Sequence, residues 1–257
     1  MARTRKVATF ALGGGVATLS GFYAFLIGEA LLARRAIGTT DARPPTPDGL
    51  YGEALGGRTI RCLVIGDSAA VGYGMTSSDS TPAGLLGVGL SHVLDAQVEM
   101  RCQAVVGAQT SDLMAQIELA EGFKPDVAVI VVGTNDVTHR VLPRASVRML
   151  AKVVTRLTSD GCEVVVGTCP DLGTVRPILQ PLREVARQWS RRLARQQTIG
   201  VVRAGGRAVS LCDLPGGLFK GPVSYTHLRA HETVLDLVCR LQLENKKISP
   251  AHHISFA

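Results

Sequence analysis

The chain has 257 residues, of which 46% are hydrophobic, and its formal net charge is +7. This length and apolar content suffice for one sizeable core. Aromatic residues make up only 4%, and the basic residues are dispersed or terminal, so the chain lacks both a base-stacking platform and a Lys/Arg run that tracks phosphates. We therefore expect no nucleic-acid partner.

Residues 1–36 predict a membrane anchor or a signal segment. No charged residue occurs from Val7 to Gly28, and about twenty such residues suffice to cross a bilayer as a helix. A basic start followed by an apolar region also fits a secretory signal. The segment ends in Glu29 and Arg34-Arg35 rather than in a small-x-small cleavage site, which favours the anchor. We expect a membrane-anchored or exported protein.

Residues 37–57 contain Pro44, Pro45, Pro47 and several glycines, which predicts a linker. In residues 58–222, short apolar runs alternate with longer amphipathic stretches. We expect helices over residues 81–94, 110–121, 142–159 and 177–197, and strands over residues 60–66, 97–105, 127–132, 162–168 and 199–203. This order predicts an α/β domain, a three-layer sandwich around a five-stranded parallel sheet with right-handed crossovers.

Two motifs occupy equivalent positions, each directly after an apolar run. Gly66-Asp67-Ser68 follows the run that starts at Ile60, and Gly133-Thr134-Asn135-Asp136 follows the run that starts at Val127. A Gly-Asp-Ser sequence alone is compatible with a strand-to-helix turn in which Asp or Ser caps the helix. Because ligands of such sheets bind beyond the carboxyl ends of the strands, a matching pair of motifs favours a site there.

The residue types are those of a serine hydrolase. Ser68 supplies a hydroxyl nucleophile, and an oxyanion needs donors that are fixed in advance. The backbone N–H groups of Ser68 and Gly107 and the side-chain amide of Asn135 are candidate donors. Asp67 and Asp136 fit a structural role better, because a carboxylate beside a strand end binds loop N–H groups.

These blocks, in this order, resemble the SGNH, or GDSL-type, hydrolase family over roughly residues 58 to 218. The resemblance implies a flavodoxin-like architecture, Ser68 as the nucleophile, and Gly107 and Asn135 in the oxyanion hole. It also implies hydrolysis of a small-molecule, lipid or carbohydrate ester through an acyl-enzyme. An acyltransferase and a non-catalytic binding module on the same scaffold are the alternatives. The six cysteines lack short metal-binding spacings, so we expect no metal and no cofactor.

The catalytic base is where the sequence departs from the family. The family's histidine follows an aspartate by three residues in a block near the end of the domain, whereas the one Asp-x-x-His of this chain, Asp136-Val137-Thr138-His139, lies in the Gly-x-Asn-Asp block. His139, three residues after Asp136, is a candidate substitute, although a base needs hydrogen-bond reach to the serine and an orienting carboxylate.

Residues 223–257 do not resemble the end of an α/β domain. The string from Val223 to Thr233 looks like the in-frame translation of a transposase-type sequencing adapter, and such segments are excluded from fold reasoning. We expect a non-native tail in place of the last catalytic block, and hence an inactive fragment.

Overall fold

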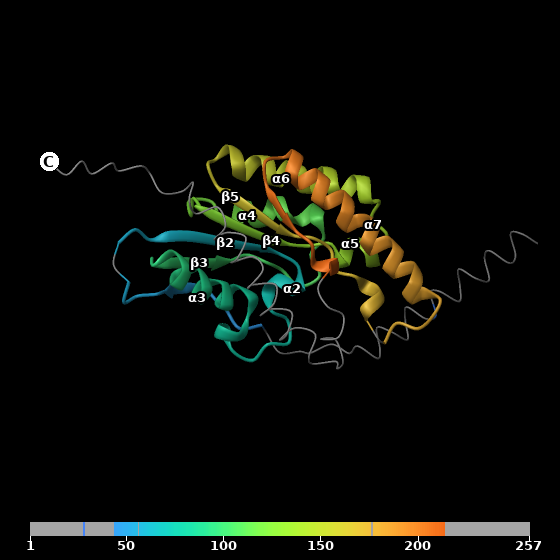
Figure 1. The fold of residues 1–257 in the computed structure, drawn as a ribbon, viewed down its shortest axis with the longest axis horizontal. Coiled ribbons are helices and arrows are strands. Elements are labelled where there is room, and N and C mark those ends of the chain that lie inside the picture. The colour runs from blue at the N-terminus through green and yellow to red at the C-terminus, as the bar shows by residue number, and fades with distance from the viewer. Residues whose placement is uncertain (1–27, 29–43, 56, 176, 214–257) are drawn as a thin grey trace, which may run out of the picture.

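The computed structural model describes Gly28 and residues 44–55, 57–175 and 177–213. Its centre is a six-stranded sheet with helices on both faces (Figure 1). The spatial order of the strands is β1-β3-β2-β4-β5-β6. Their bounds are β1 Gly49–Tyr51, β2 Ile60–Gly66, β3 Val98–Cys102, β4 Val127–Val131, β5 Glu163–Gly167 and β6 Arg207–Val209.

The helices follow the strands in alternation, as the sequence predicts. They are α2 Ser68–Val71, α3 Pro82–Leu94, α4 Leu113–Leu119, α5 Thr134–Thr138, α6 Pro143–Ser159 and α7 Leu182–Arg203. Both α3 and α6 begin with a proline, whose missing N–H costs nothing in a first turn. The Thr81 hydroxyl caps α3 by accepting a hydrogen bond from the Gly84 N–H at 3.0 Å.

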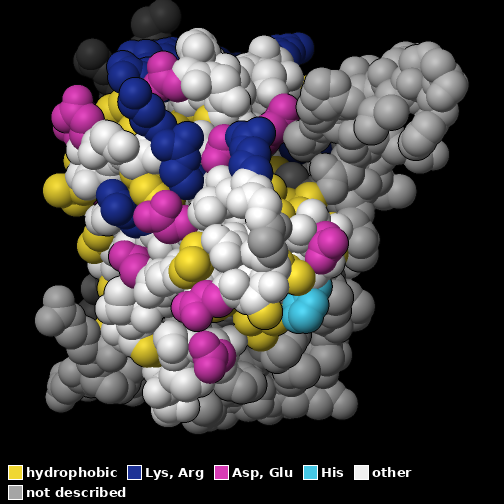
Figure 2. All heavy atoms as spheres, turned by 90° about the vertical axis from the view of Figure 1, so that its left-hand side faces the viewer, with side chains coloured by type: hydrophobic (Ala, Val, Ile, Leu, Met, Phe, Trp, Pro, Cys, Tyr) yellow, Lys and Arg dark blue, Asp and Glu magenta, His cyan; other side chains and the backbone are white. Residues whose placement is uncertain are grey.

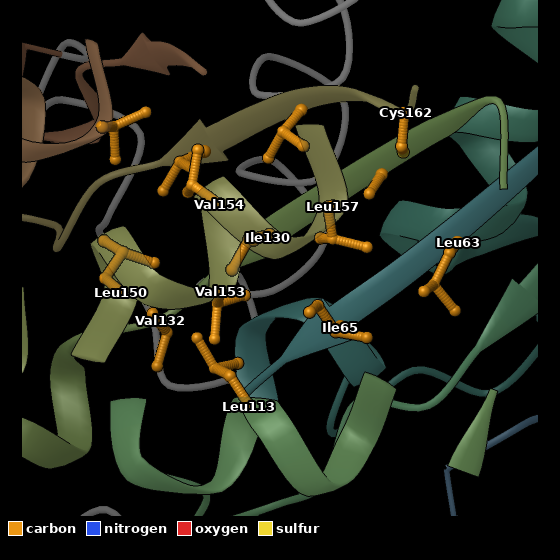
Figure 3. Packing of buried hydrophobic residues seen from close by; sticks show 14 of the residues in the cluster. Leu63, Ile65, Leu113, Ile130, Val132, Leu150, Val153, Val154, Leu157 and Cys162 are labelled. Atoms are coloured by element: carbon orange, nitrogen blue, oxygen red, sulfur yellow. The ribbon is translucent and has the colours of Figure 1, made fainter. Parts of the chain in front are cut away.

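The two faces of β2 bury alternate residues under different helices. Leu63 and Ile65 pack with Leu150 and Leu157 of α6 in one core cluster (Figure 3). Cys62 and Val64 lie in a second cluster, which includes Leu86 and Leu90 of α3. Because successive strand residues point to opposite faces, this alternation produces the predicted three layers. The α/β fold class is confirmed.

The chain reverses its direction of winding at the centre of the sheet. From β2 it crosses to β3 on one side, and it then returns to place β4 on the other side of β2. Strands β3, β2 and β4 run parallel, and Gly66 at the end of β2 pairs with Val131 at the end of β4. The carboxyl edge of these three strands is therefore a topological switch point, where α/β sheets bind ligands.

The predicted strand over residues 199–203 is wrong, because these residues form the last part of α7. Val201 is fully buried, while Ile199 and Val202 on either side of it are exposed. The apolar residues of this run therefore lie on different faces of a helix, and only one face is buried. Packing of α7 against α6 outweighs the β-propensity of the run. The fifth parallel strand is β6, which begins after the turn at Gly205 and Gly206.

The predicted linker over residues 37–57 is wrong for its last part. β1 pairs antiparallel with β3, so the sheet has one strand more than the five parallel strands expected. The Cys102 N–H donates to the Asp48 carboxylate at 2.8 Å, and a Cβ on Gly87 of α3 would lie 2.6 Å from the ring of Tyr51. The domain therefore begins before Arg58.

The opposite end of the sheet, where the strands begin, carries charges of both signs (Figure 2). Arg58 pairs with Asp126 at 2.5 Å, and Arg207 pairs with Glu163 at 3.3 Å. Basic side chains gather in the upper part of this view with acidic ones beside them, and further acidic side chains lie below.

Two further predictions fall outside the described residues. The apolar segment from Val7 lies there except for Gly28, and so does the adapter-like tail over residues 223–257. Among the helices that the described residues form, none has both the length and the apolar composition for a bilayer span.

Candidate active site

The site is built on the close approach of two strand ends. Gly66 has φ +142°, and a Cβ on it would lie 2.0 Å from the carbonyl oxygen of Val131. The next N–H, that of Asp67, donates to the same oxygen at 3.0 Å. Only glycine fits at position 66, because both the space and the backbone conformation exclude a side chain.

A buried glutamine of α4 holds Gly66 from the other side. The Gly66 N–H donates to Gln116 Oε1 at 2.8 Å, and Gln116 Nε2 donates to the Gly66 carbonyl at 3.0 Å. The Val105 N–H donates to that carbonyl too, at 3.1 Å, so the loop after β3 is tied to the same point.

Ser68 is the first residue of α2, and Asp67 is its N-cap. Asp67 Oδ1 accepts from the Ala69 N–H at 2.9 Å, which fixes the first turn. Ser68 is partly exposed. Within the described part of the chain, neither its hydroxyl nor its backbone N–H makes a hydrogen bond. A hydroxyl and an N–H are therefore both available at this strand end.

Gly107 lies in the exposed loop after β3. It has φ +86°, and a Cβ on it would meet no atom within 4 Å. Its N–H makes no hydrogen bond among the described residues. Asn135 of α5 reaches this loop, because its Nδ2 donates to the Ala108 carbonyl at 2.9 Å. The structure thus brings the Gly107 loop and Asn135 together beside the end of β2, as the sequence predicts.

The glycine of the second motif is also constrained. Gly133 has φ +138°, and a Cβ on it would lie 2.7 Å from the Cβ of Cys169. Beside it, Gln197 of α7 is fully buried. Its Oε1 accepts from the Cys169 N–H at 2.7 Å, and its Nε2 donates to the Val132 carbonyl at 3.1 Å. One side chain thus joins the ends of β4 and β5.

Asp67 and Asp136 both accept hydrogen bonds from backbone N–H groups of the surrounding loops. Asp136 accepts from the Thr110 N–H at 3.2 Å and from the Thr110 hydroxyl at 3.0 Å, and that hydroxyl lies 3.0 Å from the hydroxyl of Ser146. Burial raises the pKa of Asp136, although the hydrogen bonds from Thr110 oppose this. Burial also raises the pKa of Asp67 to about 6, against the N–H groups of Ala69, Gly133 and Thr134.

The sequence did not reveal the roles of Gln116, Gln197, Thr110 and Ser146. The sequence contained one indication for Gln116, because this polar residue lies between Leu113 and Ile117 on a helix face that is otherwise apolar. A buried, uncharged side-chain amide can donate to and accept from backbone groups that have no hydrogen-bond partner on a neighbouring strand.

His139 does not take the position of a base in the described structure. It is exposed at the end of α5, and its Nδ1 lies 2.8 Å from the carbonyl oxygen of Asn135 in its own helix. His92 is exposed on α3. No histidine among the described residues forms a hydrogen bond with Ser68.

Comparison with known proteins agrees with this geometry. A family model described as the GDSL-like Lipase/Acylhydrolase family matches residues 64–228. A GDSL-like esterase of Mycobacterium tuberculosis is 35% identical over 233 residues, which cover 84% of this chain and 74% of that protein. An arylesterase of Vibrio mimicus is 29% identical over 106 residues, which cover 41% of this chain and 52% of the relative.

Solved structures share the fold at low sequence identity. TesA superposes with a TM-score of 0.55 at 16% identity, over 72% of this chain and 98% of its own. The esterase EstA from Pseudoalteromonas gives the same TM-score at 12% identity, over 74% of this chain and 99% of its own. The fold is that of SGNH-type hydrolases. The chain belongs to the GDSL-like lipase/acylhydrolase family, whose named relatives are esterases.

Gly66→Ala should destabilise the domain by on the order of 3 kcal/mol or more, since the new Cβ collides with backbone that cannot move aside. Gly107→Ala is the matched control, with the same type of conformation and open space, and should cost about 1–2 kcal/mol. Urea unfolding of both variants measures the difference. Equal losses would contradict the close contact between Gly66 and Val131.

Asp67→Asn should change the pH dependence of stability. The folded-state pKa of Asp67, about 6, lies above the unfolded value of about 3.9, so the folded state binds more protons between about pH 4 and pH 6. This contribution is complete below pH 4 and is lost as the pH rises through 6, amounting to about 3 kcal/mol. Urea unfolding at several pH values should show a shallower decline in the variant. Asp136, whose pKa is shifted in the same direction, still contributes to the decline in the variant.

Proposed function

We propose that the natural protein is a serine ester hydrolase that uses Ser68 as its nucleophile through an acyl-enzyme. One observation carries the proposal: the N–H groups of Ser68 and Gly107 make no hydrogen bond within the described part of the chain, and Asn135 is tied to the same loop as Gly107. Unbonded N–H groups at neighbouring strand ends are what an oxyanion hole requires.

In the proposed cycle, Ser68 Oγ attacks the ester carbonyl carbon while a base takes its proton. The carbonyl oxygen becomes an oxyanion, which accepts from the two N–H groups and from the Asn135 amide. Collapse of this intermediate expels the alcohol, which takes the proton from the base. Water then attacks the acyl-enzyme by the same route and releases the carboxylic acid. The open space above Gly107 is where the acyl carbon can approach the backbone.

We infer that the base belongs to an Asp-x-x-His block that the natural gene encodes after Pro222, where this chain carries the adapter-like string instead. His139 is a poor substitute, because its Nδ1 contacts its own helix and no carboxylate orients it. The chain as it stands is then expected to show only the residual catalysis of an oxyanion hole without a base.

The proposed substrate is a small-molecule, lipid or carbohydrate ester. Relatives are named for esterase activity, and a structure with the same fold, Axe2 of Geobacillus stearothermophilus, is an acetylxylan esterase. Acyl transfer to a sugar hydroxyl could start from the same intermediate, and a binding module would form none. We also propose that the apolar segment from Val7 to Gly28 anchors the protein in a membrane or directs its export.

A protein that carries the natural continuation after Pro222 should hydrolyse a short p-nitrophenyl ester, and Ser68→Ala should abolish this activity. Asn135→Ala should lower kcat about 10²–10³-fold, the usual effect of losing one oxyanion donor. A serine-directed phosphonate should label the parent protein at Ser68 and leave Ser68→Ala unlabelled.

Unchanged turnover in Ser68→Ala would refute the nucleophile, and an Asn135→Ala effect confined to KM would indicate ground-state binding. Ser77→Ala, a serine in the exposed turn before α3, is the control that should leave turnover unchanged. Full esterase activity from the 257-residue chain itself would refute the missing base.

The 257-residue chain should sediment with membranes, and a chain that starts at Pro44 should not, because it lacks the apolar segment. Fractionation followed by N-terminal sequencing tests this. Recovery of the intact chain in the soluble fraction would refute the anchor, and a shortened N-terminus would indicate a cleaved signal.

A further inference from the structure

A groove of about 600 Å³ runs between the first residues of α6 and the first half of α7. Its volume lies within the usual range for small-molecule sites. None of Ser68, Gly107 and Asn135 lines it, so it is separate from the candidate active site. The two helices pack side by side on one face of the sheet (Figure 1).

Two arginines line this groove without a partner. Arg144 of α6 and Arg192 of α7 are exposed, and neither forms an ion pair or a hydrogen bond with any other described residue. Other arginines of the same helices do pair with acids. Arg156 bonds to Asp160 at 3.0 Å, and Arg191 bonds to Asp171 at 2.9 Å. Positive charge is therefore left uncompensated at the groove, where it favours an anion.

The groove also has an apolar part. Leu142 and Val185 line it and are 69% and 38% exposed, a high exposure for large aliphatic side chains. Trp189 also lines the groove, and it packs against a core cluster that includes Val137 of α5. A ligand that covered Leu142 and Val185 would remove their apolar surface from water.

The indole N–H of Trp189 is an unmet hydrogen-bond donor. Its nitrogen is buried and makes no hydrogen bond, the one such side-chain atom found among the described residues. A buried donor without an acceptor costs stability; because this nitrogen is shielded from solvent, a ligand in the groove would contact the indole ring and not its N–H. The side-chain amides of Gln188 and Gln196 add further polar groups to the same lining.

We propose that this groove binds an anionic amphiphile, an aliphatic carboxylate whose head group pairs with Arg144 and Arg192 and whose tail covers Leu142 and Val185. The carboxylate oxygens accept from the two guanidinium groups, and the tail lies against the apolar side of Trp189. This site does not depend on the function proposed for Ser68, since it shares no residue with it.

Trp189 is the single tryptophan of the chain, so its fluorescence reports on the groove alone. The full 257-residue chain, held in a non-ionic detergent at neutral pH, is titrated with hexanoate. We expect a saturable change in Trp189 emission. Two control ligands should bind at least about tenfold more weakly than hexanoate. They are 1-hexanol, which has the same tail and no charge, and acetate, which has the charge and almost no tail.

Arg144→Gln and Arg192→Gln should each raise the Kd for hexanoate about tenfold, the effect of losing one charge-assisted hydrogen bond. Arg148→Gln is the matched control, because Arg148 lies one turn further along α6, is exposed and does not line the groove. It should leave the Kd unchanged. Raised salt should weaken hexanoate and not hexanol.

If Trp189 emission does not change, calorimetry of the same protein measures whether hexanoate binds. Absence of hexanoate binding by both methods would overturn the proposal. Equal affinity for hexanoate and hexanol would reduce the site to an apolar groove, and equal losses in Arg148→Gln and Arg144→Gln would reduce it to general attraction by a basic surface. Either result would also overturn it.

Discussion

The contact between the backbones of Gly66 and Val131 is the constraint on which the rest of the candidate site depends. A Cβ on Gly66 would lie 2.0 Å from the carbonyl oxygen of Val131. The ends of β2 and β4 can approach this closely only because Gly66 has no side chain. This contact brings Ser68, at the start of α2, within the same sheet edge as Asn135, at the start of α5. A hydroxyl and an amide 67 positions apart in the chain thus come to the same edge of the sheet, and the missing side chain of Gly66 permits the close approach of the two strand ends.

Buried polar side chains then fix what the glycine permits. Gln116 binds both backbone groups of Gly66, Gln197 joins the ends of β4 and β5, and Asp136 holds the loop that carries Gly107 through Thr110. Each tie satisfies backbone groups that no neighbouring strand can reach. The buried carboxylates are held at a cost, since burial raises the pKa of Asp136 and raises that of Asp67 to about 6. Donors held in this way need no rearrangement when charge develops on a substrate.

The described residues thus contain the proposed nucleophile and the proposed oxyanion donors, and no described histidine hydrogen-bonds to Ser68. The proposed oxyanion donors are local to the central three strands, whereas the base that we propose belongs to a later segment of the natural chain. On this proposal, the division allows a chain to fold as a member of the family without a complete catalytic apparatus. The groove between α6 and α7 lies outside this division, since its arginines and Trp189 come from helices that are fully described.

The sequence by itself determined the elements whose signals are local. Apolar runs identified β2, β4 and β5. The candidate site and the family were located by two motifs, a glycine followed two residues later by a serine after β2, and a glycine followed two residues later by an asparagine after β4. Only the tertiary structure decided that the residues around Val201 are helical, that residues 49–51 add a strand, and that Gln116 and Gln197 hold the strand ends. It also decided that Arg144 and Arg192 share one groove. The physical reason is the same in each case: these outcomes depend on partners distant in sequence, and a local pattern carries no information about what a side chain will meet after the chain has folded.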